Sequence, residues 1–403
     1  MKTNKKLYSV TLASATLILF LILVSSTASA SIAKTRITNH GTAGNPDIYD
    51  NKIVWQDTRN GNSAIYAYDL STKKETKITD SSQYRPAIYG NRIVWDDFRN
   101  NNWGIYMYDL STSKETQITT DRHTDEPDIY GNKIVWDDNH NGYWCIYMYD
   151  LSTSKETQIT TKGRAFYPAI YGNTVVWWDN RNENGKWDIY AYDLSTSKET
   201  QITTSGSAYC PDIYGNKIVW QDNRNGNGDI YMYDLSTKKE TRITTNPSDS
   251  EDPVIYGNNI VWMDNRNGRL DIYAYDLITH QQVHTTDKSA PSAPAIALYD
   301  NKIAWIDTCN GNPDVYMGTI SYLPVAAFSA SPTTGKHPLN VQFTDKSTDE
   351  YYYSWNFGDK SALSTLENPV HKYNKIGKYT VSLTVKNAAG SNMAKKTSYI
   401  IVK

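Results

Sequence analysis

The strongest constraint on the fold of this 403-residue chain is an internal repeat of about 40 residues. Seven tryptophans recur at spacings of 40 to 43 residues, at Trp55, Trp95, Trp136, Trp177, Trp220, Trp262 and Trp305. In the clearest copy, residues 211–245, apolar runs alternate with turn residues and predict four short strands. We expect them at residues 212–214, 217–221, 229–235 and 240–244, with a two-residue hairpin turn at Gly215-Asn216.

Four antiparallel strands in each repeat are typical of a β-propeller blade. The runs Ile-Val-Trp and Ile-Tyr-Met-Tyr are apolar at successive positions, which indicates strands buried on both faces, as between packed blades. The last repeat lacks a fourth-strand sequence, whereas residues 34–38 form an isolated copy of it before the first tryptophan. The sequence therefore predicts a seven-bladed β-propeller over residues 31–322, in which residues 34–38 form the outer strand of the last blade and remove its open edge.

The repeat P-D-I-Y-G-N-K-I-V-W-x-D-x-R-N-G-x-x-D-I-Y-x-Y-D-L, which covers residues 34–320, resembles the repeats of TolB-like propellers. It resembles those of archaeal cell-surface propeller proteins more closely. The resemblance implies the fold and an envelope setting, but not an activity, because such propellers host binding, scaffolding and some enzymes.

Residues 324–403 have a different character, with short alternating strands and turn residues that predict a small β-sandwich. The sequences Tyr-Ser-Trp-Asn-Phe-Gly-Asp at 353–359 and Gly-Lys-Tyr-Thr-Val-Ser-Leu-Thr-Val at 377–385 resemble a PKD domain, an immunoglobulin-like module of surface proteins. Asn356 stands where that family usually has Asp, and Lys360 where it usually has Gly.

The first 30 residues predict export. Lysines within residues 1–6 precede an almost wholly apolar stretch, and Ala28-Ser29-Ala30 is typical of a cleavage site, so residues 1–30 are interpreted as a signal peptide. An uncleaved membrane anchor is the alternative. No later segment is expected to span a membrane, so we expect a secreted or cell-surface protein. The net charge of −2 argues against a nucleic-acid partner. The three cysteines, Cys145, Cys210 and Cys309, are expected to be free and mostly buried thiols.

Aspartates recur two residues after each tryptophan, at Asp57, Asp97, Asp138, Asp179, Asp222, Asp264 and Asp307. Arginines follow two residues later in five repeats, at Arg59, Arg99, Arg181, Arg224 and Arg266. A ring of catalytic carboxylates is one interpretation, but a group repeated in every blade is more typical of a structural acceptor paired with its arginine. The histidines do not cluster, and no catalytic motif is present, so no metal, cofactor or catalytic residue is predicted.

The loops joining strands one to two and three to four repeat Tyr-Gly-Asn and Leu-Ser-Thr, which indicates a plain scaffold on one face of the ring. The loops of the other face vary and carry aromatic and charged residues. Those beside the two–three loops are Trp103, Tyr143, Trp144 and Trp187. Those at the four–one junctions, where residues before a recurring proline should approach the channel mouth, are Tyr84, Arg85, Glu126, Phe166, Tyr167, Tyr209 and Asp252. We expect a recognition face centred on blades two to five, because exposed aromatic rings are typical of binding sites. Packing of the same rings between blades is the alternative.

These observations predict a non-catalytic, extracellular binding or scaffolding protein. Its partner would be a cell-envelope protein or glycan, and the PKD-like sandwich would act as a spacer or docking module. A carbohydrate-active enzyme such as a polysaccharide lyase, or a structural surface-layer component, are the alternatives.

Overall fold

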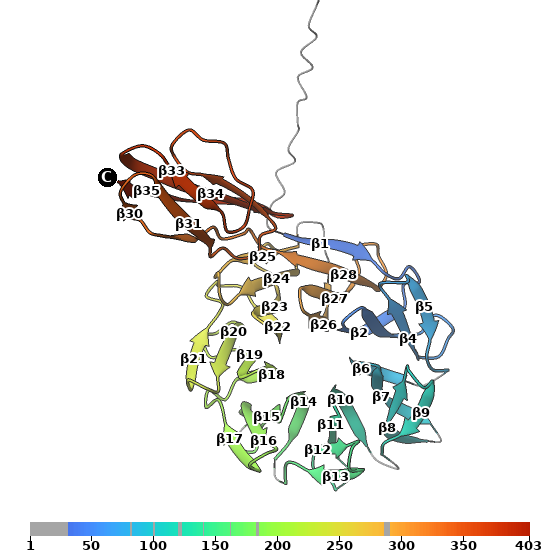
Figure 1. The fold of residues 1–403 in the computed structure, drawn as a ribbon. Coiled ribbons are helices and arrows are strands. Elements are labelled where there is room, and N and C mark those ends of the chain that lie inside the picture. The colour runs from blue at the N-terminus through green and yellow to red at the C-terminus, as the bar shows by residue number, and fades with distance from the viewer. Residues whose placement is uncertain are drawn as a thin grey trace, which may run out of the picture.

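The computed structural model describes residues 31–80, 83–99, 101–119, 123–139, 141–161, 163–182, 185–285 and 291–403. The predicted signal peptide, residues 1–30, lies outside the described residues. The described chain forms a ring of seven four-stranded antiparallel sheets, followed by a sandwich of two further sheets (Figure 1). This confirms the predicted all-β fold, a seven-bladed β-propeller followed by an immunoglobulin-like β-sandwich.

In blades 1 to 6 the strands run in chain order from the central channel outward. Blade 1 comprises β2 (Ala43–Tyr49), β3 (Lys52–Asp57), β4 (Ala64–Asp69) and β5 (Lys74–Lys77), and blade 2 comprises β6 (Gln83–Tyr89), β7 (Arg92–Arg99), β8 (Asn102–Asp109) and β9 (Lys114–Gln117). Blade 3 comprises β10 (Thr124–Tyr130), β11 (Lys133–Asp138), β12 (Cys145–Asp150) and β13 (Lys155–Gln158), and blade 4 comprises β14 (Ala165–Tyr171), β15 (Thr174–Asp179), β16 (Asp188–Asp193) and β17 (Lys198–Gln201). Blade 5 comprises β18 (Ala208–Tyr214), β19 (Lys217–Asp222), β20 (Asp229–Asp234) and β21 (Lys239–Arg242), and blade 6 comprises β22 (Ser250–Tyr256), β23 (Asn259–Asp264), β24 (Asp271–Asp276) and β25 (Gln282–His284).

The tryptophan of each repeat lies at the contact between two blades. All seven are at most 1% exposed. Trp95, for example, belongs to one core cluster with Val54 and Ile65 of the preceding blade. Burial on both faces of the second and third strands is what their continuous apolar runs predict. Replacing one such tryptophan with alanine typically costs about 3–5 kcal/mol.

Blade 7 combines both ends of the propeller sequence. Its strands are β26 (Pro291–Tyr299), β27 (Lys302–Asp307) and β28 (Asp314–Ser321), and its outer strand is β1 (Ser31–Arg36). The pairing runs from Ser31 opposite Ser321 to Arg36 opposite Tyr316, so the strand begins three residues earlier than the expected 34–38. This pairing gives blade 7 the same number of strands as the other blades.

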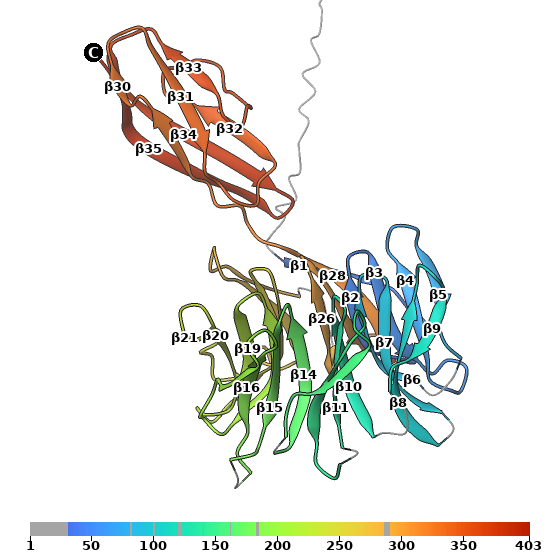
Figure 2. The same cartoon turned by 60° about the horizontal axis from the view of Figure 1, so that its bottom comes forward.

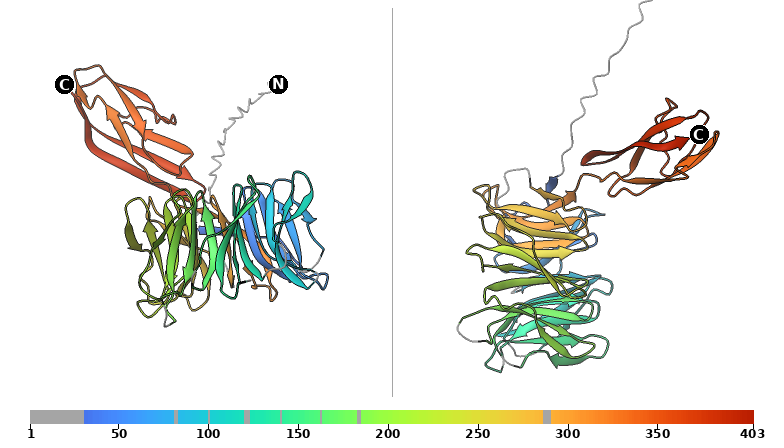
Figure 3. Two further views of the ribbon diagram at one scale, coloured as in Figure 1. Left: turned by 90° about the horizontal axis from the view of Figure 1, so that it is seen from below. Right: turned by 90° about the vertical axis from the view of Figure 1, so that its left-hand side faces the viewer.

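The two faces of the ring differ in their connections. We call the face with the one–two and three–four turns the hairpin face, and the face with the two–three and four–one connections the loop face. The chain leaves blade 7 on the hairpin face, because β28 ends there. Gln281, in the turn between β24 and β25 on this face, bonds through its side-chain amide to both the N–H and the carbonyl of Leu323. The sandwich therefore extends from the hairpin face (Figures 2 and 3).

The sandwich packs one three-stranded sheet on one four-stranded sheet. The first consists of β29 (Phe328–Ser331), β31 (Leu339–Asp345) and β33 (Val370–Tyr373). The second consists of β30 (Thr334–Gly335), β35 (Gly390–Val402), β34 (Gly377–Asn387) and β32 (Tyr352–Asn356). Trp355, Phe343 and Tyr373 are fully buried in its core. Lys360 has a φ of 68°, a left-handed conformation that glycine adopts most easily.

Candidate functional site

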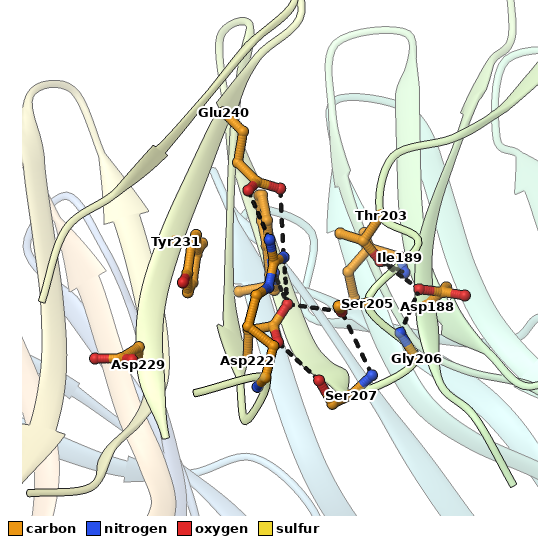
Figure 4. A network of polar contacts seen from close by, with 12 residues as sticks. Asp188, Ile189, Thr203, Ser205, Gly206, Ser207, Asp222, Asp229, Tyr231 and Glu240 are labelled. Atoms are coloured by element: carbon orange, nitrogen blue, oxygen red, sulfur yellow. Dashed lines mark hydrogen bonds and ion pairs between the residues drawn. The ribbon is translucent and has the colours of Figure 1, made fainter. Parts of the chain in front are cut away.

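The repeated aspartates are structural. In blade 5, Asp222 accepts hydrogen bonds from Trp220 Nε1 (3.2 Å) and from the backbone N–H of Arg224 (2.9 Å). The Arg224 guanidinium also bonds to Glu240 at 2.7 Å and lies 4.3 Å from the centre of the Tyr231 ring (Figure 4). Burial alone would raise the pKa of Asp222, but hydrogen bonds from Arg224 and from two serines hold it below its usual value. The carboxylate is therefore held ionised by its partners, which is the predicted structural role.

The inner strand of blades 1 to 6 carries a bulge at the loop face, immediately before its proline or at it. The residue before each proline has a φ of 45–50°: Asn45, Arg85, Glu126, Tyr167, Cys210 and Asp252. A bulge in this conformation redirects one side chain out of the sheet, at a cost of about 1–3 kcal/mol each. All six residues line the central channel. The fold therefore places one variable side chain from each of these blades around the channel mouth.

Acidic side chains outnumber basic ones at this channel mouth. Arg85 forms ion pairs with Glu126 (2.9 Å), with Asp96 (3.6 Å) and with Asp125. Asp96 is fully buried, and neither of its carboxylate oxygens has a hydrogen-bond partner among the described residues. Burial, with the negative charge of Glu126 beside it, raises the pKa of Asp96 well above its usual value.

Blade 3 has a buried aspartate at the position that corresponds to Asp96 of blade 2. Asp137 is 1% exposed and accepts a hydrogen bond from the backbone N–H of Tyr167 (3.1 Å). Its other oxygen has no partner in the described part of the chain. Burial raises the pKa of Asp137 well above its usual value, and burial also raises the pKa of Glu126. Blades 2 and 3 thus form an acidic sector of the mouth.

Blades 3 to 5 form an adjoining aromatic sector. Trp144 contacts Phe166 across the boundary of blades 3 and 4 (5.3 Å between ring centroids), and Trp178 contacts Trp187 (4.7 Å) and, in blade 5, Tyr209 (5.1 Å). The other ring pairs of the sector are His123–Trp144, Phe166–Trp178, Phe166–Trp187, Tyr167–Trp178 and Trp187–Tyr209. Most of these rings are only partly buried, and Tyr167 is 39% exposed. The rings therefore both join neighbouring blades and present a surface on the loop face.

The channel behind the mouth is a cavity of about 660 Å³. Three aspartates line this cavity, each two residues further along its inner strand than the bulge residue: Asp47, Asp128 and Asp212. Each accepts the N–H of the following isoleucine and an N–H of the next blade; Asp128, for example, accepts from Ile129 (2.7 Å) and Ile170 (2.8 Å). Burial nevertheless raises the pKa of Asp47 and of Asp212 to about 7.

The hairpin end of the channel carries a closed ring of tyrosines. Neighbouring ring centroids lie 4.5–4.8 Å apart around the whole circle. The members are Tyr49, Tyr89, Tyr130, Tyr171, Tyr214, Tyr256 and Tyr299. Burial and the neighbouring phenols raise the pKa of Tyr49 to about 12, so its phenol stays neutral. The tyrosines that begin the one–two turns, which were predicted to be plain scaffold, thus also line the channel.

The structure brings most of the predicted site residues together. Arg85, Glu126, Tyr167 and Asp252 line the channel, and Trp144, Phe166, Trp187 and Tyr209 belong to the aromatic sector. Trp103 lies apart in blade 2, where it pairs with Phe98 and contacts Tyr84 (5.5 Å), and Tyr143 is 69% exposed.

Sequence reasoning missed five residues of this region. Asn45 and Cys210 share the bulge position, while Asp96, Asp137 and Trp178 each follow the repeated tryptophan. That position varies between repeats, holding Gln56, Asp96, Asp137, Trp178, Gln221, Met263 and Ile306. Its variation within an otherwise constant strand is the signal that could have identified it.

The expectation of mostly buried thiols was wrong. All three cysteines are free, but only Cys145 is buried; Cys210 is partly exposed and Cys309 is exposed. Cys309 occupies the arginine position of blade 7, at the solvent-facing end of the strand. Across the described residues, no three His, Cys, Asp or Glu side chains gather closely enough to hold a metal ion.

The comparisons with known proteins concern both parts of the chain. Residues 323–402 match the PKD domain family. Collagenase ColA of Bacillus cereus is 45% identical over 49 residues, which is 12% of this chain and 5% of that protein. The β-propeller domain of the trilobed protease from Pyrococcus furiosus matches at a TM-score of 0.57 and 13% identity, over 70% of this chain and 94% of that one. That domain has an open velcro topology, whereas here β1 completes blade 7.

Oligogalacturonate lyase from Vibrio parahaemolyticus matches at a TM-score of 0.53 and 13% identity, over 73% of this chain and 99% of that one. At these identities the likeness concerns the fold alone. The described chain is a seven-bladed β-propeller followed by a β-sandwich, and the family model of the PKD domain matches residues 323–402.

Proposed function

We propose that this protein is a non-catalytic recognition protein of the cell exterior whose loop face binds an envelope glycan. The observation that carries the proposal is the aromatic sector of blades 3 to 5. Its rings are large, held by one another, and partly exposed beside a channel mouth. Rings of this kind stack on the apolar faces of sugars and lose little conformational freedom when they bind.

The setting outside the cell is supported by the PKD domain and by the predicted signal peptide. Among the described residues, none forms a helix with the length and apolar character that a membrane span requires. Since the sandwich extends from the hairpin face, it can act as a spacer or docking module while the loop face meets the ligand.

The test measures binding of the protein to purified envelope polysaccharide. Trp187→Ala and Trp144→Ala are expected to weaken binding about tenfold or more, measured at a temperature at which each variant is folded, because loss of ring contacts between blades lowers the melting temperature as well. Ile278→Ala, at a residue that is 63% exposed in a hairpin-face turn, is the matched control and should bind normally. Undiminished binding by both tryptophan variants would contradict the proposal. Binding to an envelope protein but to no polysaccharide would replace the glycan with a protein partner.

The enzymatic alternative, a polysaccharide lyase, makes a different prediction. Depolymerisation of the polysaccharide that a chelator abolishes would establish it and contradict a binding-only role. A structural surface-layer role predicts instead that the protein assembles into sheets as its concentration rises.

A further inference from the structure

The central channel carries an excess of acidic over basic side chains that the aromatic sector does not explain. Among the described residues that line it, five are acidic and one, Arg85, is cationic. The acidic residues are Asp47, Glu126, Asp128, Asp212 and Asp252. Arg85 is already engaged by Glu126, Asp96 and Asp125. The channel therefore lacks the cations that would balance its carboxylates.

Two further acidic side chains, Asp96 and Asp137, are buried behind the residues that line the channel. Both oxygens of the fully buried Asp96, and one oxygen of the 1% exposed Asp137, have no hydrogen-bond partner in the described chain. Buried carboxylate oxygens that accept no hydrogen bond are costly, and a cation bound nearby would lower that cost. Asp96 lies beside Arg85 and Asp137 beside the backbone of Tyr167, and both of those bulge residues line the channel, so a cation at the mouth would come close to both carboxylates.

The acidic groups are arranged at two levels along the channel. Glu126 and Asp252 lie at the bulges, and Asp47, Asp128 and Asp212 lie two residues further in along their strands. The tyrosine ring follows about 7 Å beyond the second level. Between the acidic positions the wall is apolar, formed by Ala87, Ala169, Val254 and Ala297 together with prolines and isoleucines.

From this arrangement we propose that the channel binds a linear polyamine, which enters from the loop face. Ammonium groups separated by short alkyl chains match carboxylates separated by apolar wall, and the phenol oxygens of the tyrosine ring can accept hydrogen bonds from the innermost ammonium group. A compact divalent ion does not match this pattern, because the described acidic side chains do not gather into a metal-binding group. The site is distinct from the aromatic sector and goes beyond the proposed glycan binding.

The test is calorimetric titration of spermidine into the full chain at moderate salt and at about pH 8, because burial raises the pKa of Asp47 and Asp212 to about 7. We expect saturable binding that Glu126→Gln and Asp128→Asn each weaken about tenfold. Asp80→Asn is the matched control, because the Asp80 side chain is 98% exposed and outside the channel, and its affinity should be unchanged. Glu126→Gln weakens the ion pair with Arg85 of blade 2 but keeps a side-chain oxygen that can accept from it, and it changes no backbone hydrogen bond between blades. It therefore keeps the test informative if Asp128→Asn folds poorly; the melting temperature of each variant is measured alongside.

Three results would overturn the polyamine site. The first is no binding of spermidine, and the second is equal weakening by Asp80→Asn, which would indicate general counterion attraction. The third is binding of a lysine-rich peptide or of magnesium ions with at least the affinity of spermidine. Trp187→Ala separates this site from the glycan site: it should weaken polysaccharide binding and leave spermidine binding unchanged.

Discussion

Each blade contains buried aspartates, and their partners decide what each one does. Asp222 is fully buried yet accepts bonds from an indole, a guanidinium and two serine hydroxyls, so its negative charge is compensated. Asp96, which is just as buried, has its oxygens unpartnered and its charge only partly offset by Arg85. The first aspartate therefore stabilises the fold, whereas the second stores an unfavourable interaction at the channel mouth.

Arg224→Met should destabilise the propeller by about 3 kcal/mol, because it leaves Asp222 and Glu240 without their shared cation while keeping most of the apolar stem. Denaturant unfolding measures the loss. The double variant Arg224→Met with Asp222→Asn should recover part of it, since the buried charge is then gone. A single variant within about 0.5 kcal/mol of the unchanged protein would show that this ion pair contributes little.

Asp96→Asn should raise the stability by about 1–2 kcal/mol at alkaline pH, where the variant removes an ionised buried carboxylate. The gain should shrink at acidic pH, because burial raises the pKa of Asp96 and the carboxyl is then neutral. Arg85 keeps two acidic partners in this variant, Glu126 and Asp125. A melting temperature below that of the unchanged protein would mean that Asp96 has a structural role.

At the level of strands, blade 7 lacks the loop arginine found in five of the other blades, and its outer strand β1 supplies a cation in its place. Blades 1, 2, 4 and 5 place a glutamate of the outer strand against the arginine of the second loop. Blade 7 has Cys309 in the arginine position, and the equivalent outer-strand position holds Lys34. Lys34 Nζ lies 3.5 Å from Asp307 and 5.3 Å from the centre of the Tyr316 ring. The cation thus comes from β1 instead of from the loop.

Lys34→Glu should therefore destabilise the propeller by about 2–4 kcal/mol, because it places a second carboxylate beside the buried Asp307. Adding Cys309→Arg recreates the pattern of the other blades and should restore most of the loss. Thermal unfolding of the single and double variants measures both effects. If Cys309→Arg gave no rescue, β1 would not carry out the role of an outer strand in solution.

Sequence alone predicted the strands and the ring well, because the repeated tryptophans, glycines and hairpin residues act locally. It placed the first strand of the clearest repeat at residues 212–214, whereas β18 begins at Ala208. The difference arises from the bulge at Cys210-Pro211, since a proline usually interrupts a ladder and the sequence gives no sign that pairing resumes beyond it. The tyrosine ring was missed for another reason: its residues are constant, and their closeness exists only once seven blades surround one axis.

At the scale of the whole molecule, Asp47, Asp128 and Asp212 each connect two blades, namely blades 1 and 2, 3 and 4, and 5 and 6. Because these carboxyl groups titrate, the stability of the propeller ring depends on pH. Burial raises the pKa of Asp47 and Asp212 to about 7, well above the value of about 4 in the unfolded chain. Because the folded pKa is the higher one, their contribution to stability is full below pH 4 and is lost as the pH rises towards 7.

The double variant Asp47→Asn with Asp212→Asn should therefore lose less stability between pH 4 and pH 8 than the unchanged protein does. The quantity to compare is the slope of the unfolding free energy against pH. The absolute free energy is a poorer measure, because asparagine accepts fewer backbone hydrogen bonds than aspartate. Chemical unfolding at several pH values gives both slopes. Parallel slopes would show that these carboxylates do not titrate in this range.

We propose that the ligand binds to the loop face, and not to the hairpin face or the sandwich. The most direct measurement is hydroxyl-radical footprinting of the full chain in the presence and absence of isolated cell envelope. We expect protection of Trp144, Phe166, Trp187 and Tyr209 on the loop face, with unchanged labelling of Ile278 on the hairpin face and of Leu363 and Met393 in the sandwich. Protection confined to the sandwich or to the hairpin face, with the aromatic sector labelled as in the free protein, would contradict the claim.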